Sequence, residues 1–191
     1  MKAELIQAIG RYIELTESDQ RLIGELFRKK ILEKNDYWLL EGEVCRHLGL
    51  VTQGVLRYFY NRDGEEITYN FGREGDFVCN YLSFFQQQPS AKIIQATEPT
   101  ELLVISYEQL QRFYQQVKDG ERFGRLLMEK NYAEVIHQLT SQYTDSPEKR
   151  YLNFLHHFPD LVQRLPQYYI ASYVGVKPQS LSRIRKRLLV R

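Results

Sequence analysis

The sequence has few of the residues that cross-link small proteins or bind metals. Its 191 residues include two cysteines, Cys45 and Cys79, which are far apart in the chain and form no CxxC arrangement. Two cysteines are too few for a disulfide framework, a four-thiolate zinc site or an iron–sulfur cluster. The expected compartment is therefore a reducing cytoplasm, with both thiols free and buried.

Long apolar runs are missing as well. No stretch approaches the roughly 18 apolar residues that a membrane-spanning helix needs, and the N-terminus "MKAELIQAIGRYIEL" lacks the apolar centre of a signal peptide. We therefore expect no membrane partner. Hydrophobic residues make up 43% and aromatic residues 13% of the chain, which is typical of a folded globular protein.

Acidic residues are absent from the C-terminal end. Between Leu161 and Arg191 the chain has seven basic residues and no Asp or Glu, although the whole chain carries 26 basic and 24 acidic residues. The rest of the chain is therefore net acidic. Such an asymmetry indicates an acidic partner for the C-terminus: nucleic acid, an anionic membrane surface or the protein's own acidic part.

Between Lys29 and Tyr107 short β-rich runs alternate with glycines. The runs are "KKILEK", "RHLGLV", "VLRYFY", "EITYNF", "KIIQAT" and "ELLVIS". Asp63-Gly64 separates two of them and predicts a hairpin, because both central residues of a type I′ turn have positive φ. Strands at this spacing predict an antiparallel barrel or roll, interrupted by one polar-aromatic insertion, "YLSFFQQQPS".

A long helix is predicted from about Val117 to Tyr143. Apolar residues at steps of three and four form a broad stripe on it, which favours a helix at a dimer interface over an ordinary core helix. The residues assigned to this dimer helix are Phe123, Leu127, Met128, Tyr132, Val135 and Leu139.

The C-terminal residues predict a helix-turn-helix. Ser146 and Pro147 begin a preceding helix, Gly175 supplies the tight turn, and Pro178 starts the second helix, whose apolar side is Leu181, Ile184 and Leu188. Its opposite side offers amide, hydroxyl and cationic groups suited to base edges and phosphates in the major groove. The predicted DNA-binding residues are Lys177, Pro178, Gln179, Ser180, Ser182, Arg183, Lys186 and Arg187.

Two simpler readings compete with DNA binding. The first is that the basic face is simply solvated. A solvated face usually includes some acidic residues, however, and this segment has none over thirty residues. A basic amphipathic helix can also lie on anionic lipid, but it would present bulky apolar anchors rather than follow a tight turn. Double-stranded DNA is therefore the expected partner.

Four stretches together resemble the bacterial CRP/FNR family of transcription regulators: "LLEGE", "VTQGVLRYFY", "EGDFVCNYLSF" and "IASYVGVKPQSLSRIRK". The resemblance covers nearly the whole chain. It implies an α+β fold with an N-terminal antiparallel β-roll of the jelly-roll type flanked by helices. The implied domains are a cyclic-nucleotide-binding-like sensor at 1–116, a dimerisation helix at 117–144 and a helix-turn-helix domain at 145–191. It also implies a homodimer and, as a further partner, RNA polymerase.

The resemblance is imperfect at both functional sites. The family's E-x-x-S-R reader appears as Gln179, Ser182 and Arg183, and the change from Glu to Gln alters the expected half-site, because Glu accepts from cytosine whereas Gln pairs with adenine. In cAMP-binding members a Gly-Glu pair and an Arg-Ser or Arg-Ala pair hold the phosphate. The matching ligand-pocket positions here are Gly75, Asp76, Cys79, Asn80, Ser90 and Ala91.

Without the arginine the pocket lacks a bidentate phosphate clamp, and Lys92 is the nearest cation. We therefore expect weak cAMP binding or none, an unidentified small-molecule effector or no effector, and no other cofactor. Thiol sensing at Cys79 is the less favoured alternative to a buried inert cysteine.

No catalytic or metal-binding residues are predicted. The four histidines show no metal-ligand spacing, and His47 is the only one within the predicted roll, so a cupin-like enzyme is disfavoured. A further alternative is a ligand sensor whose C-terminal domain binds a protein. Steep salt dependence of binding would favour DNA over that alternative.

Overall fold

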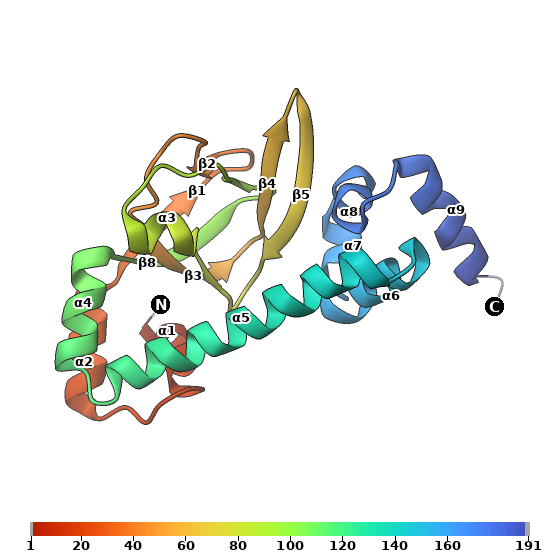
Figure 1. The fold of residues 1–191 in the computed structure, drawn as a ribbon. Helices are drawn as coiled ribbons and strands as arrows, with labels where there is room; N and C mark the ends of the chain where they lie inside the picture. The colour runs from red at the N-terminus through yellow and green to blue at the C-terminus, as the bar shows by residue number, and fades with distance from the viewer. Residues whose placement is uncertain (1, 190–191) are drawn as a thin grey trace. The chain divides into compact units, whose positions relative to one another are not determined.

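A computed structural model describes residues 2–189, so Arg191, one of the seven C-terminal basic residues, lies outside the described residues. Two helices, α1 (Lys2–Gly10) and α2 (Glu17–Leu26), precede the strands (Figure 1). The strands are β1 (Arg28–Leu32), β2 (Tyr37–Leu39), β3 (His47–Gln53), β4 (Leu56–Arg62), β5 (Glu65–Gly72), β6 (Phe77–Val78), β7 (Ile93–Ala96) and β8 (Thr100–Ser106). The remaining helices are α3 (Tyr81–Gln86), α4 (Tyr107–Gln116), α5 (Gly120–Thr144), α6 (Pro147–His157), α7 (Leu161–Arg164), α8 (Gln167–Val174) and α9 (Pro178–Leu189).

The strands form two four-stranded sheets with the orders β1-β8-β3-β6 and β2-β7-β4-β5. β8 pairs antiparallel with both β1 and β3, so that Val104 lies opposite Arg28 on one side and Gly49 on the other. Buried leucine and isoleucine side chains come from both sheets, among them Leu39, Leu50, Leu56, Ile94, Leu102 and Ile105. This is the predicted antiparallel β-roll with flanking helices.

The Asp63-Gly64 turn joins β4 to β5 as predicted. Asp63 has φ of 52° and Gly64 has φ of 86°, the two positive values that a type I′ turn requires. The Gly64 N–H donates to the Asn61 Oδ1 over 3.0 Å, which ties the turn to the strand before it.

Several elements differ from the sequence-based expectation. The insertion at Tyr81–Ser90 contains α3, whose first turn is capped by the Asn80 side chain. The short strands β2 and β6 and the one-turn helix α7 were not anticipated. Short elements carry too little periodicity to be read from sequence.

The chain divides into two compact units. The first comprises the residues up to Tyr58 together with Phe71–Lys130, and the second comprises Phe59–Asn70 with the chain from Asn131 onward. The outer part of the β4–β5 hairpin therefore groups with the C-terminal helices rather than with the roll. The predicted boundaries at 116 and 144 stay a prediction.

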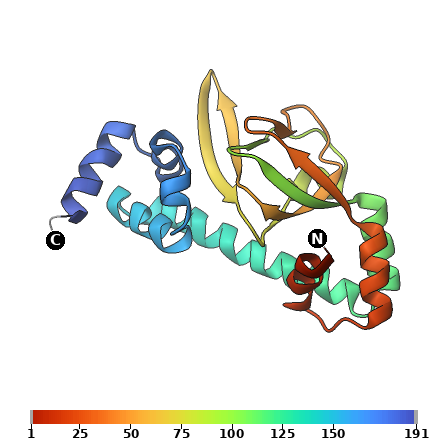
Figure 2. The same ribbon diagram turned by 180° about the vertical axis from the view of Figure 1, so that it is seen from behind.

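In the first unit α2 and α4 lie side by side (Figure 2), and Asp19 stabilises this region. Its carboxylate accepts from the Thr16 N–H and hydroxyl, which completes a capping box at the start of α2, and from the Lys118 N–H over 3.0 Å. Burial alone would raise the pKa of Asp19, but these hydrogen bonds outweigh it and lower the pKa. Asp19 thus joins the start of α2 to the residues just before α5.

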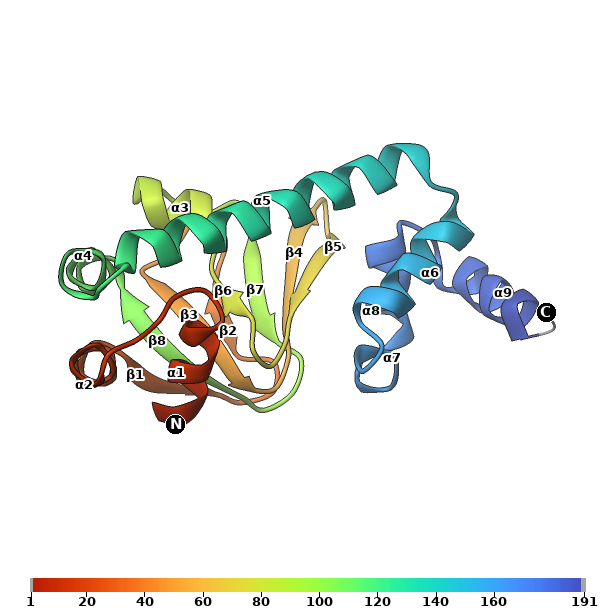
Figure 3. The same cartoon turned by 90° about the horizontal axis from the view of Figure 1, so that it is seen from below.

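In the second unit α6 to α9 surround their own core (Figure 3). The Ser146 hydroxyl caps α6 and Pro147 occupies its first turn, as predicted. The core side chains are Tyr151, Phe154, Phe158, Leu161, Leu165, Ile170, Ala171, Val174, Leu181 and Ile184.

Candidate nucleic-acid interface and effector pocket

Helices α8 and α9 are joined by a tight left-handed turn. Gly175 has φ of 74° and ends α8, and the Val176 N–H donates to the Ala171 carbonyl over 3.0 Å. The Arg150 side chain donates to the Val174 carbonyl over 2.7 Å, so a helix carbonyl freed by the turn is satisfied from α6. This turn determines the direction in which α9 leaves α8.

α9 has one buried and one exposed side. Leu181 and Ile184 are buried against α8, where Ala171 is also fully buried, and Leu188 is half-buried. The predicted DNA-binding residues are all exposed: Lys177, Pro178, Gln179, Ser180, Ser182, Arg183, Lys186 and Arg187. The amide, hydroxyl and cationic groups that can read base edges thus lie on one accessible helix face.

Two of these cations form ion pairs with acidic side chains of the same unit. The Lys177 Nζ lies 2.8 Å from the Glu65 Oε1 on the β4–β5 hairpin, and the Arg187 Nη2 lies 3.3 Å from the Glu148 Oε2 on α6. The hydrogen bond and charge of each partner lower the pKa of Glu65 and raise the pKa of Lys177. The Lys177–Glu65 pair is largely exposed, and in the second pair Arg187 is exposed while Glu148 is half-buried, so both cations can exchange these carboxylates for phosphate contacts.

The edge of β5 contacts α8 through one side chain. The Ser172 hydroxyl accepts from the Thr68 N–H over 2.9 Å and donates to the Glu66 carbonyl over 3.1 Å. The Gln138 side chain of α5 donates to the Tyr69 carbonyl. These contacts satisfy backbone groups of an edge strand, which would otherwise be open to pairing.

The predicted effector pocket is closed by hydrogen bonds among its own residues. The Asn80 amide donates to the Ser90 hydroxyl over 2.6 Å, and that hydroxyl in turn donates to the Lys92 carbonyl over 2.8 Å. Asn80 and Ser90 are buried. Burial also lowers the pKa of Lys92. The polar groups at the phosphate-binding positions are thus already satisfied by each other.

Only part of the predicted pocket set comes together. Gly75 and Asp76 form a turn before β6, in which the Gly75 N–H donates to the Val51 carbonyl over 2.9 Å and the Asp76 carboxylate accepts from the Arg73 N–H over 3.0 Å. Ala91 is exposed and adds no polar side chain. These positions support the backbone rather than line the Asn80–Ser90 contact.

Cys79 contacts a residue that the sequence-based set lacked. Its Sγ lies 3.7 Å from the Sγ of Cys45, and both side chains are buried. The Ser83 hydroxyl on α3 accepts from the Cys45 N–H over 2.9 Å, which joins the segment before β3 to the pocket. No local sequence pattern links positions this far apart, so only the fold reveals them.

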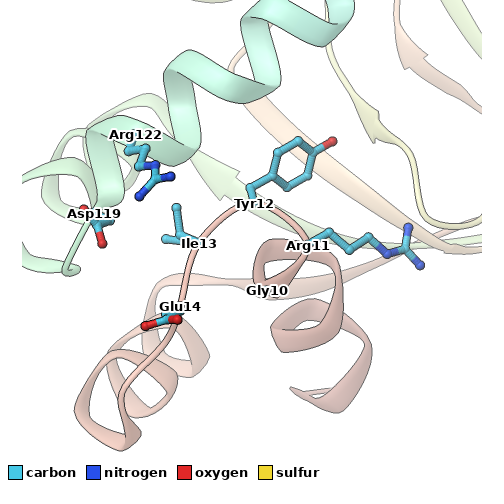
Figure 4. A pocket seen from close by; sticks show the side chains of 7 residues that line it. All are labelled: Gly10, Arg11, Tyr12, Ile13, Glu14, Asp119 and Arg122. Atoms are coloured by element: carbon cyan, nitrogen blue, oxygen red, sulfur yellow. The ribbon is translucent and has the colours of Figure 1, made fainter.

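A separate hollow of about 360 Å³ lies where the end of α1 meets the start of α5 (Figure 4). It is lined by Gly10, Arg11, Tyr12, Ile13, Glu14, Asp119 and Arg122. The side chains of Arg11 and Arg122 point in different directions in Figure 4, so the hollow offers no convergent pair of cations for an anion.

Metal binding and membrane crossing find no support in residues 2–189. No group of three or more histidine, cysteine or carboxylate side chains is placed to hold an ion in this part of the chain. None of the helices described there is long and apolar enough to span a bilayer.

The predicted dimer helix is α5, and burial divides its residues into two sets. Phe123 and Leu127 are buried in the first unit, where the Phe123 ring packs edge-on against Tyr12, Phe77 and Phe113 at centroid distances of 5.3–5.5 Å. These two side chains are therefore covered by their own chain, and Met128 is half-buried. Further along α5 the exposed apolar side chains are Tyr132 (70%), Val135 (57%), Ile136 (41%), Leu139 (51%) and Tyr143 (84%).

Comparisons with known proteins agree with this architecture. Residues 29–117 match the family described as the cyclic nucleotide-binding domain. The solved structure of FixK2 from Bradyrhizobium japonicum has 16% sequence identity and a TM-score of 0.70, with 86% of this chain and 85% of that chain covered. CLP from Xanthomonas campestris, described as a c-di-GMP responsive global regulator, has 17% sequence identity and a TM-score of 0.69, with 92% of this chain and 92% of that chain covered. The catabolite activator protein of Thermus thermophilus has 18% sequence identity and a TM-score of 0.60, with 95% of this chain and 86% of that chain covered. No curated protein matches the sequence.

The stretch that is similar to the cyclic nucleotide-binding domain thus includes all the strands of the roll except Arg28, the first residue of β1. The chain has the fold of the CRP/FNR transcription regulators, an N-terminal β-roll followed by a C-terminal helical region, as the sequence resemblance implied. The sequence identities to these structures are 16–18%, and the similarity that they show is similarity of fold.

Proposed function

We propose that this protein is a homodimeric, sequence-specific DNA-binding transcription regulator that reads duplex DNA with α9. The observation that carries the proposal is the exposed face of α9, where Ser182 and Arg183 lie one turn after Gln179, beside further cations. Arg makes bidentate bonds to guanine and Gln to adenine, while the neighbouring cations neutralise phosphates. The known regulators of the same fold support this reading.

The dimer half of the proposal rests on the apolar stripe of α5. Tyr132, Val135, Leu139 and Tyr143 recur at helical spacing and are more than half exposed in the single chain. A stripe of this kind is buried when a second copy of the helix packs against it. A two-fold dimer presents two α9 helices to half-sites about one helical turn apart, which predicts a palindromic operator.

The effector half of the proposal is that cAMP is not the ligand. Ser90 stands where the resemblance implies an arginine, and its hydroxyl is held by Asn80 and Lys92. A cyclic phosphate would have to break these bonds without gaining a charge-assisted clamp. RNA polymerase is, by the same resemblance, the protein that the DNA-bound dimer would contact.

The experiment that tests DNA reading is selection of random duplexes by the purified protein, with Arg183→Ala beside it. We expect an enriched palindrome whose affinity falls steeply with salt, and a loss of about 1 to 3 kcal/mol with relaxed specificity for Arg183→Ala. Arg185→Ala is the matched control, because it removes the same charge from the half-buried side of α9. Absence of binding even at low salt would contradict the proposal and favour a protein partner for this face.

A further inference from the structure

We propose that Cys45 and Cys79 form a modification site, a buried dithiol that a hydroperoxide oxidises to an intramolecular disulfide. The proposal concerns the cyclic nucleotide-binding domain alone and goes beyond the proposed DNA-binding function. It rests on the placement of two thiols from distant parts of the chain.

The two sulfur atoms are already in van der Waals contact. The Cys45 Sγ and the Cys79 Sγ lie 3.7 Å apart, and the two side chains are 2% and 4% exposed. A disulfide needs a separation of about 2.05 Å, so the sulfurs have to approach by less than about 2 Å. The only two cysteines of the chain meet in the core, and one of them, Cys79, lies at a position where the resemblance implies a phosphate site.

The two thiols differ in a way that assigns their roles. A hydrogen bond with the Cys79 thiol and backbone hydrogen bonds with Asn80 and His47 lower the pKa of Cys45 despite its burial. Burial and the neighbouring sulfur raise the pKa of Cys79 well above its ordinary value. The opposite directions of the two pKa shifts assign the attack to Cys45, once its thiol has lost a proton, and the resolving role to Cys79.

Both thiols are buried, and access of an oxidant to Cys45 requires a local opening of the segment that carries it. Cys45 lies in an irregular segment between β2 and β3, with exposed Glu43 and Arg46 and half-buried Val44 around it. A bridge between Val44 and Pro89 and the backbone hydrogen bonds of Ser90 with Gly42 and Glu43 hold this segment against the loop after α3. A local opening of this short segment admits a small peroxide without unfolding the roll.

The reaction balances with hydrogen peroxide as the oxidant. The Cys45 thiolate attacks one peroxide oxygen, an S–O bond forms as the O–O bond breaks, and the departing hydroxide takes a proton to become water. The Cys79 thiol then loses its proton and its sulfur attacks the Cys45 sulfenic acid; the S–S bond forms, the S–O bond breaks and a second water leaves. In sum, two thiols and one peroxide give one disulfide and two waters.

The disulfide would alter the hydrogen-bonded pocket next to it. Cys45 donates its N–H to Ser83 on α3, and Cys79 precedes Asn80, the cap of that helix and the partner of Ser90. Pulling the two sulfurs together therefore strains α3 and the Asn80–Ser90 contact at once. A transient disulfide of this kind is compatible with a reducing compartment, where protein disulfides are mostly redox-sensing.

The test uses the reduced full-length protein, treated with hydrogen peroxide at neutral pH and followed by intact mass and non-reducing peptide mapping. We expect the wild-type protein to lose the mass of two hydrogens and to give one cross-linked peptide pair, reversed by dithiothreitol. Cys79→Ser leaves a sulfenic acid on Cys45 that dimedone traps. Cys45→Ser loses the disulfide and yields no trapped sulfenic acid, with unchanged far-UV circular dichroism as the folding control.

Three results would overturn the proposal. These are two thiols that stay reduced in the folded wild-type protein but oxidise in urea, a disulfide found between chains only, or dimedone trapping on Cys79 with none on Cys45. The reduced protein's binding to duplex DNA is measured separately, so failure of the dithiol leaves the regulator proposal standing, and failure to bind DNA leaves the dithiol standing.

Discussion

At the scale of single residues, the turn between α8 and α9 depends on Gly175. Its φ of 74° is a left-handed conformation that a Cβ disfavours, and an added Cβ would meet only the Gln142 and Arg150 side chains at 3.5 and 3.6 Å. The constraint is therefore on the backbone and not on space. A replacement at this position tests the turn without introducing a clash.

We predict that Gly175→Ala lowers the free energy of unfolding by about 1 to 2 kcal/mol, the cost of placing an L-residue in the left-handed region. Thermal and urea unfolding followed by circular dichroism measure the change. Gly10→Ala is the matched control, because no atom lies within 4 Å of its added Cβ and its φ is not positive. Equal effects of the two substitutions would show that the turn does not depend on positive φ.

At the scale of elements, the β4–β5 hairpin bears on the predicted DNA-reading helix. The Glu65 carboxylate on β5 accepts a hydrogen bond from the Lys177 ammonium group, just before α9 begins. The backbone of β5 is bonded to the Ser172 side chain of α8. Lys177 belongs to the set proposed to contact phosphate, so Glu65 and DNA compete for the same ammonium group. The hairpin carboxylate thereby reduces the charge available to DNA.

We predict that Glu65→Gln increases affinity for duplex DNA by about twofold at low salt, and that the gain disappears at high salt because exposed pairs are weak and screened. Fluorescence anisotropy with a labelled duplex measures it. Glu129→Gln is the control, since Glu129 also forms an exposed pair, with Arg125 on α5. An unchanged affinity for Glu65→Gln at every salt concentration would contradict the competition.

The pH range of this pair follows from the directions of the two pKa shifts. The pKa of Glu65 is lowered, so its contribution is present above its unfolded pKa and is lost as the pH falls through its folded pKa. The pKa of Lys177 is raised, so its contribution is present below its unfolded pKa and is lost as the pH rises through its folded pKa. The pair is therefore intact between about pH 4 and about pH 10, and the effect of Glu65→Gln on DNA affinity should be constant across neutral pH.

At the scale of the whole molecule, α5 belongs to both compact units. Its first part is anchored by Phe123 and Leu127 in the first unit, and its second part, from Asn131, carries the exposed apolar stripe. The first part of α5 is thus buried by its own chain, and the exposed apolar stripe of the second part is available to a second copy of the protein. Dimerisation by the second stretch would bring two α9 helices into one particle.

We predict that Leu139→Asp converts a dimer to a monomer and weakens binding to a palindromic duplex by about tenfold or more, because each α9 then binds alone. Light scattering coupled to size-exclusion chromatography measures the mass, and anisotropy measures the affinity. His137→Asp introduces the same charge on the opposite side of α5 and should leave both unchanged. A wild-type protein that is already monomeric at micromolar concentration would exclude this interface.

Much of the fold follows from local sequence. Ser146-Pro147 begins α6, Asp63-Gly64 makes the hairpin turn and Gly175 ends α8, because caps and positive-φ turns are decided by a few adjacent residues. The two faces of α9 also follow from its own periodicity. Local rules are weaker for α3, where the Asn80 cap alone marks a six-residue helix.

The sequence by itself determined the order of roll, long helix and helix-turn-helix, and the side chains that α9 exposes, because each depends on contacts between near neighbours. Tertiary structure alone decided that Phe123 is buried while Tyr132 is exposed, since the periodicity of α5 is the same at both. It alone decided that Cys45 lies against Cys79 and Glu65 against Lys177. Contacts between residues far apart in the chain depend on how strands pair and helices pack, and no local pattern encodes that pairing.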